Sequence, residues 1–161
     1  MRKKTPQPWA PKWQRFLVAF FASSFLFDVG HQVLDVRIEL FWGLQGYDLA
    51  WVTSMFLLPL LTGVVVGLIY GWGGKLLAHF PPLVVLSIHY YITYSQGAPE
   101  GSHLIPLMWW GFFVILNMEF CAVGGVFGEL LLKRFYGTWD MPGTADYFTA
   151  DSEPLPKDTD E

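Results

Sequence analysis

Several ionisable side chains stand inside or at the edges of long apolar stretches, where a charge is costly unless it is paired or hydrated. They are Asp28, His31, Asp35, His89, Glu119 and Glu129, with Gln32 and Asn117 as uncharged companions. Carboxylate and imidazole groups in such surroundings can exchange protons near neutral pH and can bind cations. These are therefore the residue types that a path for protons, cations or a small polar solute would use.

The densest group lies between residues 27 and 36, which read FDVGHQVLDV and follow the apolar run 16–27. At about 100° per residue, four polar side chains fall within about 40° of one line, with His31 at its edge. They are Asp28, Gln32, Asp35 and Glu39. If the helix continues past Leu34, the sequence predicts a polar stripe that runs from the outer third of a membrane into the external water.

The elements that position these residues are predicted to be membrane-spanning helices. The chain is 53% hydrophobic and only 15% charged, well below the roughly 25% charged residues of soluble domains. Four apolar segments have the length of about 20 residues that a spanning helix needs. They are 16–34, 50–70, 76–94 and 104–128. We expect an all-α integral membrane protein, a four-helix bundle with short loops that occupies residues 16–135.

Lysine and arginine placement predicts the orientation of the bundle. Basic residues are found in the segment 1–15, between the second and third spans, and after the fourth span, whereas only Arg37 falls on the opposite side. The positive-inside rule therefore places both termini in the cytoplasm. The compact chain favours a bacterial inner membrane. Residues 136–161 are acidic and lack an apolar period, so we expect a disordered cytoplasmic tail.

A competing interpretation treats the first apolar segment as a cleaved signal peptide. Its basic start and 12-residue apolar core fit such a peptide. No small-x-small cleavage site follows the core, which favours a retained span. The other three spans are the same in both interpretations.

Glycines at four-residue spacing predict where the helices pack. They are Gly63, Gly67 and Gly71 in the second span, and Gly124 and Gly128 in the fourth. Small residues let helix backbones approach closely in lipid, so these faces are predicted to pack within the bundle, against a membrane-protein partner or in a homo-oligomer.

Local sequence also predicts three details of the helices. The short GWGGK connection requires an antiparallel hairpin between the second and third spans. Pro59, well inside the second span, predicts a kink, whereas Pro81 and Pro82 fall in the first turns of the third. Glu129 and Lys133 are four residues apart and are expected to form an ion pair.

Three interpretations of the intramembrane polar residues stay open. They can satisfy one another structurally, or Asp28, His31, His89 and Glu119 can line a path for protons, cations or a small polar solute. They can also hold a divalent metal or haem, for which His31, Asp35 and His89 are the candidate ligands. The chain has no HExxH motif, no paired CxxC and no phosphate loop, so no cofactor is predicted and an enzyme is not favoured.

The favoured function is that of an accessory, assembly or structural subunit of a membrane complex, because the chain is small, has tight loops and carries glycine faces. The alternative is a small transporter or channel-like protein. A haem or metal protein and a membrane-embedded enzyme are less favoured. The chain has no basic face, which argues against a nucleic-acid partner. Its single cysteine, Cys121, excludes an intrachain disulfide.

Overall fold

The computed structural model describes residues 10–43 and 48–136, with side chains described up to Arg134. The helices in chain order are α1 (Lys12–Leu34), α2 (Leu49–Val52), the π-helical turn η2 (Thr53–Leu57), α3 (Leu58–Tyr70), α4 (Gly74–Leu77), α5 (Phe80–Gln96) and α6 (Leu107–Tyr136). Two short strands, β1 (Leu40–Phe41) and β2 (His103–Leu104), complete the elements. The segment 1–9, most of the predicted tail and the acids within it lie outside the described residues.

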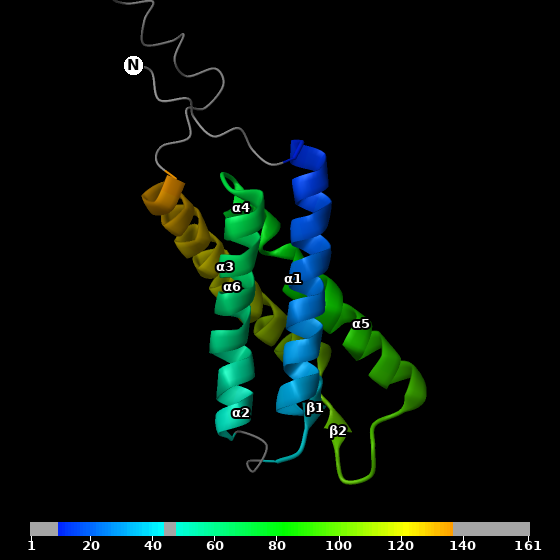
Figure 1. Cartoon of the computed structure of the whole chain (residues 1–161). Coiled ribbons are helices and arrows are strands. Elements are labelled where there is room, and N and C mark those ends of the chain that lie inside the picture. The colour runs from blue at the N-terminus through cyan, green and yellow to red at the C-terminus, as the bar shows by residue number, and fades with distance from the viewer. Residues whose placement is uncertain (1–9, 44–47, 137–161) are drawn as a thin grey trace, which may run out of the picture.

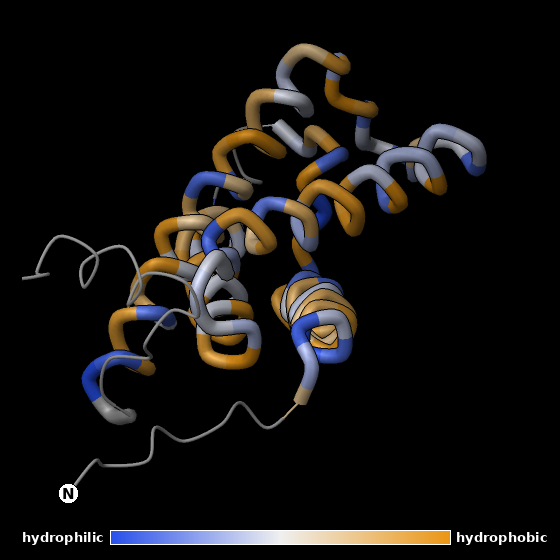
Figure 2. The backbone as a smooth tube through the Cα atoms, turned by 90° about the horizontal axis from the view of Figure 1, so that it is seen from above, coloured by the Kyte–Doolittle hydropathy of each residue, from blue (hydrophilic) through white to orange (hydrophobic). Residues whose placement is uncertain are grey.

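Within the described residues, four helical stretches are long and apolar enough to cross a membrane, in agreement with the predicted number of long apolar helices. They are Lys12–Leu34, Leu49–Tyr70, Gly74–Gln96 and Leu107–Arg134. In Figure 2, α1 is seen nearly end-on, with hydrophilic residues in its first turn and mostly hydrophobic residues behind. A helix needs about 20 mostly apolar residues to cross the hydrocarbon core of a bilayer.

The bundle has two different ends (Figure 1). The start of α1, the short helix α4 and the end of α6 lie together, and we name this the basic end after its five basic residues. They are Lys12, Arg15, Lys75, Lys133 and Arg134. The opposite end, named the β end, holds β1, β2 and the start of α2. Arg15 Nη1 donates to the Tyr70 carbonyl at 3.1 Å, which ties the start of α1 to the end of α3.

Helix α1 ends at Leu34, so the predicted continuation of the polar stripe to Glu39 is wrong. Asp35 adopts the left-handed conformation with φ of 52° and caps the helix. The Val36 amide bonds back to the His31 carbonyl at 3.1 Å, which completes a tight turn. The chain then folds back, and Glu39 becomes buried at 4% exposure instead of extending into water.

The irregularity expected at Pro59 takes the form of the π-helical turn that precedes it. The Leu58 amide bonds to the Thr53 carbonyl, five residues back, and Pro59 is the second residue of α3. A π turn is one of the ways in which a helix accommodates a proline, because it rearranges the hydrogen bonds around the missing amide.

Helices α3 and α6 pack backbone to backbone through glycines. A Cβ at Gly63 would collide with the Cys121 carbonyl, and one at Gly124 would collide with the Leu60 carbonyl. Gly67 meets Gly128 in the same way. Gly71 lies beyond this contact and ends α3 with φ of 80°.

At the basic end, Glu129 does not form the expected pair with Lys133. Its Oε1 accepts the Lys75 amide at 3.2 Å instead. This amide is in the first turn of α4, where backbone donors lack partners within the helix. The carboxylate therefore anchors α4 on α6.

At the β end, strands β1 and β2 join the connection between α1 and α2 to the connection between α5 and α6. Leu40 pairs with Leu104 and Phe41 with His103 in an antiparallel ladder. The fourth long helix therefore begins at Leu107, because Leu104 belongs to β2. This ladder holds the segment after α1 against the segment before α6 and so positions Glu39.

Candidate functional site: a polar cavity at the β end

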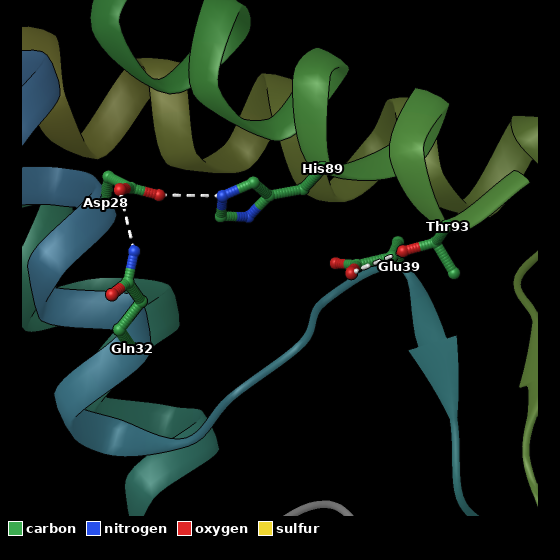
Figure 3. A network of polar contacts seen from close by, with 5 residues as sticks. All are labelled: Asp28, Gln32, Glu39, His89 and Thr93. Atoms are coloured by element: carbon green, nitrogen blue, oxygen red, sulfur yellow. Dashed lines mark hydrogen bonds and ion pairs between the residues drawn. The ribbon is translucent and has the colours of Figure 1, made fainter. Parts of the chain in front are cut away.

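The central contact of the site joins α1 to α5 through Asp28 and His89 (Figure 3). His89 Nε2 lies 2.7 Å from Asp28 Oδ1, and the two side chains are 25% and 34% exposed. Gln32 Nε2 donates to the other oxygen, Asp28 Oδ2, at 2.8 Å. Gln32 can do so because residues four apart lie on one face of a helix. Both oxygens of Asp28 are therefore engaged.

A second contact lies one helical turn further along α5. Thr93 Oγ1 donates to Glu39 Oε1 at 3.1 Å (Figure 3), and both residues are buried. The Ile105 amide also bonds to the Glu39 carbonyl at 2.9 Å. The fold-back after α1 thus brings an acid to the face of α5 that already carries His89.

A cavity of about 390 Å³ lies between these two contacts. Its polar lining comes from His31, Gln32, Asp35, Arg37, Glu39, His89, Thr93 and Gln96. Four of these side chains, Gln32, Asp35, Arg37 and Gln96, are exposed, so the cavity is reached from outside the bundle. A smaller cavity of about 140 Å³ adjoins it and shares Asp35 and Arg37 with it.

His31 is the buried polar group of this lining that lacks a complete set of partners. It is 2% exposed, and its ring packs edge-on against Phe27 with centroids 4.7 Å apart. Its Nε2 atom has no hydrogen-bond partner within the described part of the chain. A buried polar atom without a partner is destabilising, so Nε2 is an unsatisfied atom in a residue of the cavity lining.

With its two histidines neutral, the lining carries two carboxylates and one guanidinium, a formal net charge of −1. The carboxylates are those of Asp35 and Glu39, and the guanidinium is that of Arg37. A cation or a hydrogen-bond donor fits this balance better than an anion does.

The three candidate metal ligands His31, Asp35 and His89 all line the cavity. Across residues 10–43 and 48–134, however, no group of three or more His, Cys, Asp or Glu side chains could hold a metal ion. A metal site needs its ligands to converge on one point, and these three side chains do not form such a group.

Two predicted site residues lie elsewhere, on opposite sides of α6. Asn117 is fully buried, and its Nδ2 donates to Met55 Sδ and to the Phe113 carbonyl, both at 2.9 Å. Glu119 is exposed. Neither residue lines the cavity, so the structure does not bring Glu119 together with Asp28, His31 and His89.

Sequence reasoning missed four residues of this lining as site residues: Arg37, Glu39, Thr93 and Gln96. Thr93 carried a usable signal, because it follows His89 by four residues and so shares its helical face. Glu39 was visible only as part of a helical stripe that does not form. Comparison with models of known protein families, with curated proteins and with solved structures finds no match to this chain.

Proposed function

We propose that this chain is an integral membrane protein of a bacterial inner membrane that binds a small polar solute at its β end. Four long apolar helices support the membrane assignment. The clustering of basic residues at one end supports cytoplasmic termini through the positive-inside rule. The cavity then opens on the side away from the cytoplasm.

The observation that carries the proposal is a polar cavity whose lining includes buried His31, a residue whose Nε2 atom has no hydrogen-bond partner in the described chain. The cavity volume of about 390 Å³ is within the range of small-molecule sites. The formal net charge of −1 on the lining favours a solute with a positively charged or hydrogen-bond-donating group, such as a small amine.

Binding is favoured over conduction through the bundle. The polar lining ends at His31 and His89, whereas the polar residues nearer the middle of α6 lie outside it. A transporter that loads its solute at this cavity is compatible with the same geometry and would need a second conformation.

An accessory-subunit role is the second candidate, and the exposed carboxylate of Glu119 on α6 favours it.

The test is thermal unfolding of the purified full chain in detergent, with ethylamine, putrescine, glycine and acetate compared at equal ionic strength. A bound solute stabilises the folded state by about 2.7 kcal/mol at one hundred times its dissociation constant. We expect saturable stabilisation by the amines and none by acetate.

Matched variants assign the effect to the cavity. His31→Leu and Glu39→Gln should each abolish the stabilisation by amines, whereas Tyr94→Phe, on an exposed position of α5 outside the lining, should retain it. Stabilisation that is equal in all four proteins, or absent with every solute, would argue against a binding site here.

A further inference from the structure

Helix α6 presents a continuous exposed seam with one acid at its centre. The exposed positions follow each other at spacings of three and four residues, which is the period of a helix-packing face. They are Met108, Phe112, Ile115, Glu119, Val123, Val126 and Leu130. Glu119 is the only ionisable residue of this seam.

Glu119 lies deep between the two ends of the helix. At about 1.5 Å per residue it is about 18 Å from Leu107 and about 22 Å from Arg134. No hydrogen bond or ion pair among residues 10–43 and 48–134 involves its side chain. If α6 spans a membrane, as proposed above, this carboxyl group faces the hydrocarbon without a partner, which ionisable residues rarely do.

A rotation of α6 cannot bury this side chain inside the bundle. The opposite face of the helix carries Cys121, Gly124 and Gly128, which contact the backbone of α3. Because that contact leaves no room for a Cβ, it fixes which face of α6 points outward.

We propose that this seam of α6 docks against a transmembrane helix of a different membrane protein that carries a lysine, arginine or protonated histidine near the middle of its span. The apolar seam supplies packing surface, and Glu119 selects a partner of opposite charge. Pairing with an opposite charge or a hydrogen bond is how ionisable groups are accommodated at this depth.

A second copy of this chain fits the seam poorly. Between residues 16 and 132 the only lysine and arginine are Arg37 and Lys75. Arg37 lies in the connection after α1, and Lys75 lies in α4 at the basic end. A second copy inserted in the same orientation therefore has no lysine or arginine at the depth of Glu119, and its mid-helix histidine, His89, is already bonded to Asp28.

The experiment uses the labelled full chain in phosphatidylcholine vesicles and three synthetic oligoleucine helices with lysine, leucine or glutamate at the centre. Energy transfer reports association in the bilayer. We expect the lysine-centred helix to bind about tenfold more tightly than the leucine-centred helix. Glu119→Leu should remove this preference, and Glu119→Lys should transfer it to the glutamate-centred helix. Ile115→Leu, a conservative change within the seam, should leave the preference unchanged.

Several results would overturn the inference. One is equal binding of the lysine-centred and leucine-centred helices by the wild-type chain. Another is an unchanged preference in Glu119→Leu. Self-association of the chain that depends on Glu119 would assign the seam to a second copy. Resistance to alkaline extraction, measured on the same vesicles, separates these results from a failure of the membrane proposal, which extraction of the chain would indicate.

Discussion

Two of the helix contacts in this bundle are formed by opposite kinds of residue. Helices α3 and α6 meet through glycines, with each backbone directly against the other. Helices α1 and α5 meet through the polar side chains of Asp28 and His89, with a cavity beside them. Close backbone contact leaves no space for a ligand, whereas polar side chains hold helices apart and offer bonding groups. One contact is suited to stability and the other to binding.

Substitution of Gly63, in the glycine contact, should have the largest effect on the free energy of unfolding. In Gly63→Ala the new methyl group would collide with the Cys121 carbonyl, which is backbone and cannot rotate away. The helices must separate, and we expect a loss of about 3 kcal/mol of unfolding free energy. Equilibrium unfolding in mixed micelles measures it.

Gly111→Ala is the matched control, because it is also a helical glycine and a Cβ there meets nothing within 4 Å. Removing a glycine from a helix interior should stabilise it by up to about 1 kcal/mol. If Gly63→Ala and Gly111→Ala have the same free energy of unfolding, close glycine packing does not hold α3 and α6 together.

The strength of the glycine contact also explains which predictions from sequence succeed. Apolar length alone predicts four long helices, and the predicted bounds of the second, 50–70, differ from Leu49–Tyr70 by one residue. The outward orientation of Glu119 could not be predicted from depth, because the rotation of α6 is set by its contact with α3.

The candidate site was only partly predictable for a related reason. Asp28, Gln32 and His31 are on one helix, so their spacing reveals their common location. Glu39 reaches the site because Asp35 turns the chain back and because β1 pairs with β2. Such tertiary pairing leaves no periodic signal in the sequence.

Removal of the Thr93 hydroxyl should have the next largest effect, and it acts on the polar contact. Thr93→Val keeps the shape of the side chain but removes the donor to buried Glu39. Leaving a buried polar group without its partner costs about 1–3 kcal/mol, so we expect a loss of about 2 kcal/mol. Thermal unfolding and equilibrium unfolding in mixed micelles should give the same loss of stability for Thr93→Val. If Glu39→Leu, which removes the acceptor, also removes the effect of Thr93→Val, the bond is identified as its source; additive losses would contradict this.

The Asp28–His89 contact should contribute less, because both side chains are partly exposed. A double-mutant cycle with Asp28→Asn and His89→Ala should give a coupling energy of about 1 kcal/mol. The same cycle between Asp28 and exposed Tyr94 should give none, since no hydrogen bond or ion pair joins these two residues. A coupling near zero for the first pair would mean that α1 and α5 are held by apolar packing alone.

Substitution of Asp35 should have the smallest effect on stability. It is also the change that tests most directly whether stability and binding are linked. It holds a left-handed conformation with φ of 52°, which glycine adopts at lower cost. Asp35→Gly should therefore stabilise the fold by about 0.5 kcal/mol. The same change removes a carboxylate from the cavity wall and should weaken binding of an amine.

Asp35→Asn separates the two effects, since asparagine tolerates this conformation but carries no charge. We expect it to keep wild-type stability and to bind amines as weakly as Asp35→Gly. Stability that falls in Asp35→Gly would instead mean that the carboxylate itself holds the turn, and the polar end of the bundle would then be built for stability as much as the glycine contact is.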